Sequence, residues 1–364
     1  MRVMHIVPYL PIASGVSTFV TQASDAMAAR GHRQTVAVND MEHYTIAHSF
    51  QNVPRIGIKE AFTQIQFRQC DIVHMHGIWP LFMHRIVNTA RKAHLPIIWS
   101  LHGMLAPWAM RYKRWKKLPA WVLWQKRDLS YASAIHVTST LEADGVARMG
   151  INVPLINVPL GTKMHECVDW SKKDNAVLFV GRLDPVKAID NLILAWSAIV
   201  KCPVGKEWVL RIVGTDTIGY GDKLRKLVSD IGLDGSIQFL GAKYDEALDE
   251  EYRKSKIVVL PSHTENFGGV VIDALSWGVP VVASRNTPWQ ALDEKKCGKW
   301  VHNSPDAIAV ALKDLMHIGL EELKAMGDNG RHWVADKFSW ESVARQLVAG
   351  YEAVLLKGDK GFVL

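Results

Sequence analysis

The sequence IVVLPSHTENFGGVVIDALSW, residues 257–277, contains the pattern that decides the fold. It opens with four apolar residues, three of them β-branched, and such a run predicts a short strand that is buried on both faces. A loop with two adjacent glycines follows, and apolar residues at helical spacing then predict a helix that begins near Gly268. A strand, a glycine-bearing loop and a helix in this order are typical of a parallel sheet covered by helices.

The same alternation runs along the whole chain in two series. The predicted strands are Arg2–Val7, Gln34–Val38, Asp71–His76, Pro96–Leu101, Ala134–Thr138 and Leu155–Val158 in the first series, and Ala176–Val180, Val209–Val213, Ile237–Leu240, Ile257–Leu260 and Val279–Ala283 in the second. Two series predict an α/β fold with two Rossmann-like, doubly wound domains. Periodicity lapses near residues 158–173, so we predict domains over residues 1–165 and 166–338. Residues 339–364 would form a final helix that packs back toward the first domain.

Length and composition are those of a globular protein with two domains. The chain has 364 residues, of which 48% are hydrophobic and 22% are charged. Its four cysteines are far apart and form no CxxC pair, which argues against a disulfide framework or a zinc ribbon. No apolar run is long enough for a transmembrane helix, and the first residues are predicted to form a strand rather than a signal peptide. We therefore expect a cytoplasmic protein.

The positive charge is concentrated in one segment. Residues 1–170 carry 18 basic and 10 acidic side chains, a balance of +8, whereas residues 171–364 carry 25 and 26, a balance of −1. Seven of the basic side chains lie within residues 101–130, where the one acidic residue is Asp128. A local excess of this kind predicts an interaction surface rather than a property of the whole fold.

The loop after Leu260 is the first candidate for a binding site, because open parallel sheets bind ligands beyond the carboxyl ends of their strands. Glu265 lies in this loop, and Asp273 follows eight residues later on the predicted helix. The start of that helix would direct N–H groups and the positive end of its dipole at a phosphate or a sugar hydroxyl. The alternative is that Glu265 and Asp273 only cap or solvate the helix.

The second candidate is the segment VGRLDPVK, residues 180–187, which comes directly after another predicted strand. It places two cations, Arg182 and Lys187, on a short loop. Arginine offers a planar fork of donors and lysine a point charge, a combination that suits a diphosphate. The alternative is an ordinary solvated loop, but the predicted position at the same sheet edge as the Glu265 loop favours binding.

Together the two segments resemble the retaining glycosyltransferases of family 4, which have the two-domain GT-B fold. That family shows a Gly-Arg-Leu…Lys loop followed by two acids separated by seven residues. HGIW at residues 76–79, SLHGML at 100–105 with Trp108, and FSW at 338–340 are also similar to it. The resemblance covers almost the whole chain and implies two domains facing across a cleft, as in bacterial transferases of group 1 that build polysaccharide or lipopolysaccharide.

The resemblance also implies roles for single residues. Arg182 and Lys187 would neutralise the donor diphosphate, and Glu265 would hold hydroxyls of the donor sugar. His102 would contact that sugar near the reacting carbon from the opposite domain. Gly15, after the first strand, would let backbone approach the phosphates and the acceptor.

Further donor contacts would come from the glycine-bearing turn and the helix behind it. The backbone of Asn266, Phe267, Gly268 and Gly269 would line the sugar and phosphate. The second acid of the family would hold the ribose. It is usually glutamate but is Asp273 here, so a closer helix or a bridging water is needed for that contact.

The chemistry requires no cofactor beyond the nucleotide-diphosphate sugar, for which UDP or GDP is expected. Arginine, lysine and a helix start can stabilise the charge on a departing diphosphate. The chain has no Asp-x-Asp pair for a divalent cation. His74 and His76 offer two zinc ligands on one strand face, but zinc sites usually need three or four, so no metal is expected.

The basic segment combines aromatic and cationic side chains. Its residues are Trp108, Arg111, Tyr112, Lys113, Arg114, Trp115, Lys116 and Lys117. Aromatic residues at helical spacing with cations between them predict a helix at an anionic membrane surface or at a lipid-linked acceptor. A packed helix with a solvated face is the alternative, and nucleic acid is not expected because no recognition motif accompanies the charge.

These observations predict a retaining, metal-independent hexosyltransferase that acts on a glycan acceptor, lipid-linked or an oligosaccharide, in the synthesis of a cell-surface polysaccharide. It would work at the inner face of the cytoplasmic membrane. Two alternatives remain open. One is a non-catalytic scaffold that binds a nucleotide sugar, and the other is a different GT-B enzyme such as a sugar-nucleotide epimerase.

Overall fold

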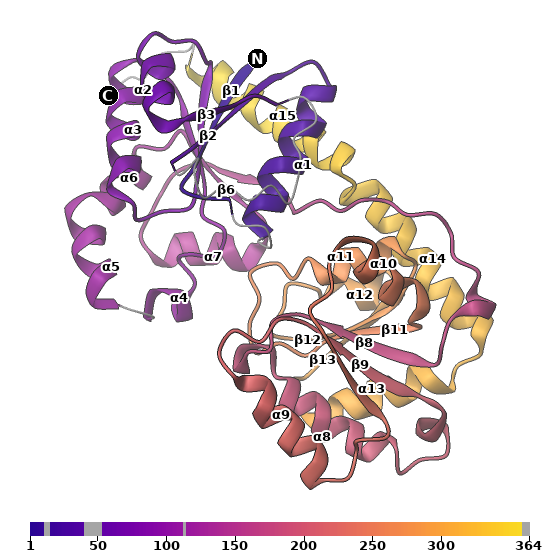
Figure 1. The fold of residues 1–364 in the computed structure, drawn as a ribbon. Helices are drawn as coiled ribbons and strands as arrows, with labels where there is room; N and C mark the ends of the chain where they lie inside the picture. Colours follow the sequence, from indigo (N-terminus) through magenta and orange to yellow (C-terminus); the bar gives the residue numbers. More distant parts are fainter. Residues whose placement is uncertain (11–14, 40–52, 112–113, 359–364) are drawn as a thin grey trace. The chain divides into compact units, whose positions relative to one another are not determined.

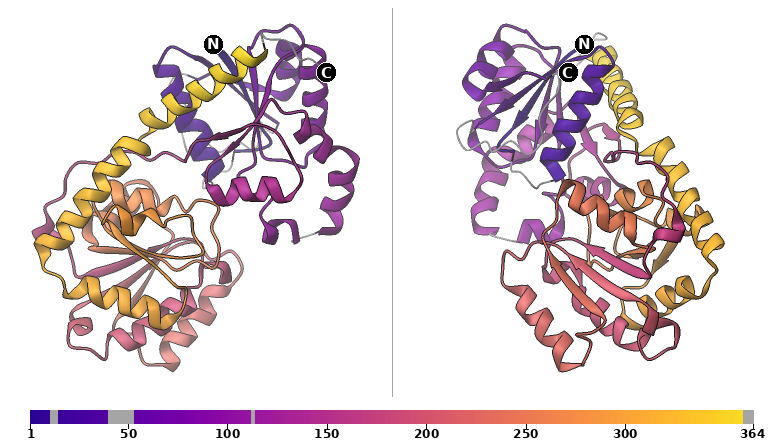
Figure 2. Two further views of the ribbon diagram at one scale, coloured as in Figure 1. Left: turned by 180° about the vertical axis from the view of Figure 1, so that it is seen from behind. Right: turned by 45° about the vertical axis from the view of Figure 1, so that its right-hand side comes forward.

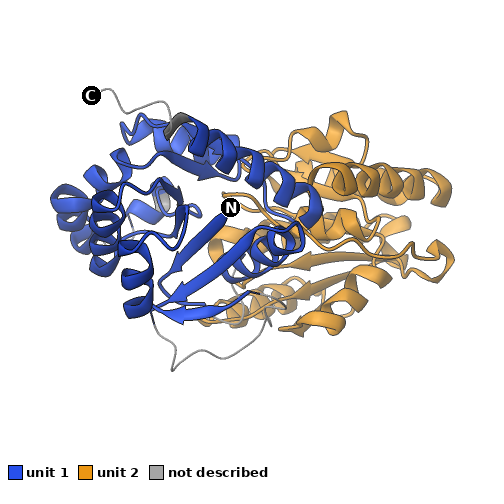
Figure 3. Ribbon diagram, turned by 90° about the horizontal axis from the view of Figure 1, so that it is seen from above, with its two compact units in different colours: residues 1–161, 340–364 blue, residues 162–339 orange. Residues whose placement is uncertain are grey.

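The computed structural model describes residues 1–10, 15–39, 53–111 and 114–358. The chain forms two compact units, one of Met1–Gly161 with Trp340–Leu364 and one of Thr162–Ser339 (Figure 3). Each unit is a parallel sheet with helices packed against it (Figure 1). The predicted α/β fold with two Rossmann-like sheets is therefore confirmed.

The sheet of the N-terminal unit has seven strands in the order β3-β2-β1-β4-β5-β6-β7. Their bounds are β1 (Arg2–Val7), β2 (Arg33–Val38), β3 (Arg55–Gly57), β4 (Ile72–His76), β5 (Ile97–Ser100), β6 (Ala134–Val137) and β7 (Leu155–Asn157). Every paired strand is parallel to its neighbour. The carboxyl ends of β1, β4, β5 and β6 therefore lie along one edge, where ligands bind in folds of this class.

The sheet of the C-terminal unit has six parallel strands in the order β10-β9-β8-β11-β12-β13. Their bounds are β8 (Ala176–Val180), β9 (Val209–Val213), β10 (Ile237–Gly241), β11 (Ile257–Leu260), β12 (Val281–Ser284) and β13 (Gly298–Val301). The sequence predicted neither β3 nor β13. Both are edge strands of three or four residues, and runs this short carry little periodicity.

The helices follow the strands along the chain. In the N-terminal unit they are α1 (Gly15–Ala29), α2 (Ile58–Gln66), α3 (Leu81–Lys92), α4 (Pro107–Arg111), α5 (Arg114–Ala120), the π-helical η1 (Trp121–Gln125), α6 (Lys126–Ser130), α7 (Thr140–Arg148) and α15 (Trp340–Gly358). In the C-terminal unit they are η2 (Trp170–Lys172), η3 (Pro185–Lys187), α8 (Ile189–Ile199), η4 (Val204–Glu207), α9 (Tyr220–Asp230), α10 (Asp245–Lys254), α11 (Val270–Ser276), α12 (Ala291–Glu294), α13 (Pro305–His317) and α14 (Leu320–Lys337). No helix among the described residues is long and apolar enough to cross a membrane.

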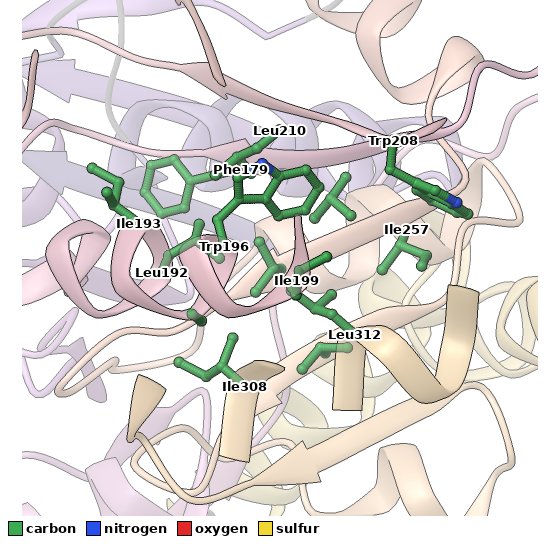
Figure 4. Packing of buried hydrophobic residues seen from close by; sticks show 14 of the residues in the cluster. Phe179, Leu192, Ile193, Trp196, Ile199, Trp208, Leu210, Ile257, Ile308 and Leu312 are labelled. Atoms are coloured by element: carbon green, nitrogen blue, oxygen red, sulfur yellow. The ribbon is translucent and has the colours of Figure 1, made fainter. Parts of the chain in front are cut away.

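The C-terminal sheet is covered on one face by α8 and α13, which pack against each other. The indole of Trp196 on α8 is fully buried beside Phe179 and Leu210 of the sheet (Figure 4). Ile308 and Leu312 of α13 belong to the same cluster. Burying aromatic and branched side chains of this size is the main favourable term in folding, so the cluster fixes the strands whose ends carry the candidate site.

The last helix, α15, belongs to the N-terminal unit and runs beside α1 (Figure 2). Val343, Leu347 and Tyr351 of α15 share an apolar cluster with Phe19 of α1. The chain leaves the N-terminal unit after Gly161 and returns to it at Trp340. At Gly161 a Cβ atom would stand 2.4 Å from the Trp340 ring, so only glycine fits under that indole.

Candidate active site

The two loops singled out in the C-terminal unit lie in contact. Nζ of Lys187 donates to Oε1 of Glu265 at 2.5 Å, and both side chains are mostly buried, with exposed fractions of 18% and 13%. The same carboxylate oxygen accepts a hydrogen bond of 2.7 Å from Ser262. The N–H of His263 donates to the carbonyl of Val186 at 2.8 Å, so backbone also joins the loops. The structure therefore brings the predicted cation and the predicted acid together.

Arg182 lies on the same loop in a different environment. Its side chain is 56% exposed, and its guanidinium lies 3.8 Å from the carboxylate of Asp184. That aspartate also accepts the N–H of Val186 at 3.0 Å and so caps η3, the turn that carries Lys187. The loop thus holds one cation in place and leaves the other exposed to solvent.

The glycine-bearing turn connects β11 to α11. Gly268 has φ +83°, a conformation that favours glycine, and a Cβ atom on it would also stand 2.9 Å from the Leu260 side chain. Gly269 precedes the helix without a side-chain cap. Within the described residues no hydrogen bond engages the N–H of Gly268, Gly269 or Val270. These donors are what a phosphate or a sugar hydroxyl would need.

Phe267 anchors this turn. Its ring is 6% exposed and packs against Trp289, with ring centroids 5.0 Å apart. The indole N–H of Trp289 donates to the Phe267 carbonyl at 2.6 Å. The side chain of Phe267 therefore belongs to the core, and a ligand contact from this residue would come from its backbone.

Asp273 lies on α11 and is engaged by another residue. Its Oδ1 accepts a hydrogen bond of 2.7 Å from Thr162. Burial raises the pKa of its carboxyl to about 6, an effect that the Thr162 hydrogen bond opposes and the nearby Asp249 supports. One carboxylate oxygen therefore already accepts a hydrogen bond within the unit, and the contact of Asp273 with the ribose stays a prediction.

The N-terminal unit holds the remaining predicted donor contacts. Gly15 is the first residue of α1, and a Cβ atom there would meet nothing within 4 Å. His102 follows β5 in the left-handed region, with φ +50°, and Gly103 continues it with φ +76°. Glu142 of α7 braces this turn, because its Oε1 accepts the N–H of Gly103 at 2.7 Å.

Glu142 is itself held firmly. Its Oε2 accepts from the N–H of Thr138 at 2.8 Å and from the hydroxyl of the same residue at 2.9 Å. The N–H of Glu142 in turn donates to Ser139, which caps α7. A serine cap with a glutamate three residues later has the sequence pattern of a capping box, but here the glutamate side chain accepts from Thr138 and fixes the loop that carries His102.

A layer of histidines that the motifs did not predict lies beneath His102. Nδ1 of His76 lies 3.1 Å from Nε2 of His102, and Nε2 of His76 lies 2.9 Å from Nδ1 of His5. Nε2 of His5 lies 3.0 Å from Oε1 of Gln34. We call these four residues the open chain, because its last member, His102, is partly exposed. The other three are buried.

A second set of hydrogen bonds lies in the same layer. The hydroxyl of Tyr351 is 2.6 Å from Nδ1 of His74, and Nε2 of His74 is 2.7 Å from Oγ of Ser100. The same Oγ is 2.6 Å from Nδ1 of His136, whose Nε2 is 2.8 Å from the carbonyl of Val158. We call this set the closed chain, because it ends on a backbone carbonyl. It fastens α15 to the sheet.

All five histidines are uncharged at neutral pH. Burial lowers the pKa of His5 and of His102 to about 4 and the pKa of His136 below its usual value. Burial among neighbouring imidazoles takes the pKa of His74 and His76 well below that value. An imidazolium here would be desolvated beside other rings.

Three of these residues could in principle hold a metal ion, because ligand atoms of His5, His74 and His76 lie within 4.8 Å of one another. All six of their ring nitrogens, however, already have hydrogen-bond partners. The group of three includes no carboxylate to balance a divalent charge. The donor set therefore fits two hydrogen-bonded chains better than a metal site.

The signal for this layer was present in the sequence, since His5, His74, His76 and His136 interrupt runs that are otherwise apolar. The register of the parallel strands makes these positions neighbours. His5 pairs with His74, and His76 pairs with Ser100. Ser100 in turn pairs with His136. Partners so far apart in the chain cannot be assigned without the sheet order.

The basic segment is helical wherever it is described, from α4 through α5 and η1 to α6. Its exposed apolar side chains are Trp115 at 73%, Leu118 at 49%, Val122 at 73% and Leu123 at 68%. Arg111, Arg114 and Lys116 are exposed beside them, whereas Lys117 donates to the Ala109 carbonyl. Tyr112, Lys113 and the side chain of Trp108 lie outside the described residues.

Comparisons with known proteins agree with the fold and the motifs. The profile of the family described as "Glycosyl transferases group 1" matches residues 162–333, and the profile described as "Glycosyltransferase Family 4" matches residues 13–162. The chain is 31% identical to the D-inositol 3-phosphate glycosyltransferase of Rhodococcus opacus (strain B4) over 195 residues, 52% of this chain and 43% of that protein. The chain thus spans less than half of the length of this curated relative.

Solved structures show the same fold over nearly the whole chain. HepE from Anabaena in complex with UDP superposes with a TM-score of 0.77 at 16% identity, covering 97% of this chain and 100% of that one. The lipopolysaccharide outer core galactosyltransferase WaaB superposes with a TM-score of 0.71 at 12% identity, covering 97% and 99%. With the GT-B fold and the two adjoining family profiles in place, the chain belongs to the group 1 glycosyltransferases of family 4.

Proposed function

We propose that the protein transfers a hexose from a nucleotide-diphosphate sugar to a glycan acceptor, without a metal ion and with retention of the anomeric configuration. The contact between Lys187 and Glu265 carries this proposal, because it places the predicted phosphate cation 2.5 Å from the predicted sugar-binding acid. A diphosphate and the sugar attached to it are likewise neighbours, so one donor molecule would meet both side chains.

The chemistry follows from where charge develops. The bond between the anomeric carbon and the diphosphate breaks and negative charge collects on the departing diphosphate. The acceptor hydroxyl bonds to that carbon and gives its proton to an oxygen of the diphosphate. Lys187 and Arg182 would stabilise that charge, together with the N–H groups of Gly268 and Gly269. Glu265 would accept hydrogen bonds from sugar hydroxyls, and Asp273 would hold the ribose directly or through water.

The N-terminal unit would supply the acceptor side and one contact to the donor sugar. We assign that contact to His102 and the close backbone approach to Gly15. A structural neighbour binds UDP, which supports UDP as the nucleotide, with GDP as the second choice. A neighbour named for lipopolysaccharide supports a cell-surface glycan as the acceptor, and the relative named for D-inositol 3-phosphate shows that small acceptors also occur in such proteins.

Donor binding is tested by thermal shift with UDP-, GDP- and ADP-sugars in the presence of EDTA. A ligand that binds only the folded state raises the melting temperature by mass action, so one nucleotide class should do so without metal. Transfer is then measured with the stabilising donor, labelled in its sugar, and extracted lipid-linked glycans. Stabilisation without transfer would indicate a binding scaffold, and a changed sugar in the recovered nucleotide would indicate an epimerase. If no nucleotide sugar stabilises the protein, the proposal is wrong.

We also propose that the basic segment contacts an anionic membrane at its cytoplasmic face, where a lipid-linked acceptor would be presented. Trp115, Val122 and Leu123 expose apolar surface beside cations, the combination that binds such surfaces. The triple variant Arg111→Glu, Arg114→Glu and Lys116→Glu should lose binding to phosphatidylglycerol vesicles and keep donor binding.

The matched control for this test lies on α9 of the other unit. Lys223→Glu, Arg225→Glu and Lys226→Glu reverse three exposed charges and change the net charge by the same amount. The control should bind vesicles like the unmodified protein. Equal binding by both triple variants would show that the segment does not contact the membrane.

A further inference from the structure

The open chain begins at a side chain whose orientation is fixed. Nε2 of Gln34 donates to the carbonyl of His32 at 3.1 Å, so its other amide atom, Oε1, must face His5. Rotating the amide would set two carbonyl oxygens against each other. An amide oxygen only accepts hydrogen bonds, and Nε2 of His5 must therefore carry the proton that lies between them.

This assignment propagates along the chain. A neutral imidazole has one N–H and one acceptor nitrogen, so Nδ1 of His5 is an acceptor and Nε2 of His76 carries the next proton. Nδ1 of His76 is then an acceptor as well, and Nε2 of His102 donates to it. Nδ1 of His102 is left with a lone pair. No hydrogen bond from the described parts of the chain engages that atom.

We infer that Gln34, His5 and His76 are positioning residues, which hold neutral His102 with its proton on Nε2 and the lone pair of Nδ1 available to a hydroxyl of the donor sugar. The inference rests on the proposed role of His102 and deepens it. It states that His102 accepts a hydrogen bond at the sugar and does not donate one. A sugar whose hydroxyl at that place is replaced by fluorine cannot donate and should be bound more weakly.

The neutral state of the layer supports the inference. Burial keeps the pKa of both His5 and His102 at about 4, so no member takes up a proton near neutral pH. Protonation of any ring would replace an acceptor by a donor and break the hydrogen bond on one side of it. The donor-to-acceptor direction of the hydrogen bonds, which Gln34 sets, is therefore maintained along the chain as far as His102.

The closed chain provides a matched comparison within the same layer. The Val158 carbonyl only accepts, so the protons run from Tyr351 through His74, Ser100 and His136 to that carbonyl. Within the described parts of the chain no hydrogen bond between the buried rings joins the two chains, although the rings of His74 and His76 lie 4.2 Å apart. Tyr351→Phe removes one buried hydrogen bond to an imidazole, as Gln34→Met does, but it does so in the closed chain.

The experiment is long-range proton–nitrogen NMR of the full protein labelled with 15N-histidine, which reports directly which ring nitrogen is protonated. His102→Asn assigns the His102 signals by their loss. The unmodified protein should show an unprotonated Nδ1 and a protonated Nε2 at His102. In Gln34→Met, His5 is released from its fixed tautomer, and His5, His76 and His102 should shift to mixed tautomers. In Tyr351→Phe the His102 signals should remain as in the unmodified protein.

Kinetics give the second measurement. Gln34→Met should lower kcat for transfer about fivefold, the effect of one weakened neutral hydrogen bond, while Tyr351→Phe should leave kcat unchanged at temperatures where it is folded. A protonated Nδ1 at His102 in the unmodified protein would overturn the inference, and so would unchanged His102 tautomers in Gln34→Met. Failure of the proposed function is seen separately, because transfer would then be absent in the unmodified protein whatever tautomers the spectra show.

Discussion

The two units carry sites of opposite electrostatic character. In the C-terminal unit, Lys187, Glu265 and Arg182 bring formal charge to the ends of the strands. In the N-terminal unit, His102 stands at the end of a chain of uncharged imidazoles. A departing diphosphate needs charge, whereas a sugar hydroxyl needs a directed hydrogen bond. Under the proposed function the C-terminal unit would meet the diphosphate with charge, and the N-terminal unit would meet a sugar hydroxyl with a directed hydrogen bond.

The largest expected effect is a stronger destabilisation of the N-terminal unit than of the C-terminal unit by acid. In the N-terminal unit the pKa values of five buried histidines are lowered: His5, His74, His76, His102 and His136. The unfolded state takes up protons below about pH 6.5, where histidine normally titrates, whereas the folded state takes them up only at lower pH, at about pH 4 for His5 and His102. Stability of this unit therefore falls as the pH drops through that window.

The C-terminal unit has a compensating group. The pKa of Asp273 is raised to about 6, so the folded state binds a proton before the unfolded state does, and acidification below that value favours the fold. His165 opposes it, because partial burial lowers its pKa. Hydrogen exchange at roughly pH 7 and pH 5, corrected for intrinsic rates, should show loss of protection in β1, β4 and β5 and a smaller loss in β8 and β11. Equal losses in both sheets would contradict this contrast.

The next effect distinguishes two ion pairs of similar geometry within the C-terminal unit. Lys243 contacts Glu251 at 2.5 Å with exposed fractions of 28% and 10%, close to the values for Lys187 and Glu265. Lys187→Ala should lower kcat/KM for transfer about a hundredfold, as loss of a donor to developing charge does. Lys187→Ala and Lys243→Ala should lower the melting temperature by similar amounts, but Lys243→Ala should leave transfer intact. If both variants lose transfer equally, Lys187 acts through stability alone.

The sequence predicted the charged part of this site because its residues lie beside predicted strands. The loop with Arg182 and Lys187 and the turn with Glu265 each lie within a few residues of a strand that was predicted, and parallel strands end at one edge. Their meeting could therefore be inferred from the fold class. The Glu265 segment itself shows this, since its strand was predicted over Ile257–Leu260 and is observed there as β11.

The histidine layer depends on information that periodicity does not contain. Its members come from β1, β2, β4 and β6, from β5 and the turn after it, and from α15, and they meet only because the sheet order places β1 between β2 and β4. Tyr351 reaches His74 from 277 residues further along the chain. The direction of the hydrogen bonds in the open chain depends in turn on Gln34 and on the backbone carbonyl of His32. A backbone acceptor of this kind is not visible in a sequence motif.

The smallest effect concerns the exposed cation, and it distinguishes Arg182 from Lys187 by salt. Arg182→Ala should weaken binding of the nucleoside diphosphate about tenfold at low ionic strength, the size expected for one charge-assisted contact. Because the Arg182 side chain is 56% exposed and the Lys187 side chain only 18%, added salt should screen the first contact far more than the second.

Calorimetry with UDP, or with the nucleotide that proves to bind, measures the contributions of Arg182 and Lys187 to nucleotide affinity at roughly 0.05 M and 0.5 M salt. Between these concentrations the Debye length falls from over 10 Å to a few ångströms. Arg225→Ala is the matched control, since that side chain is 52% exposed and pairs with Asp222 on α9. It should not change nucleotide affinity at either salt concentration. A difference between Arg182→Ala and the unmodified protein that persists in full at high salt would mean that the ligand buries Arg182, and the two cations would then do the same work in the site.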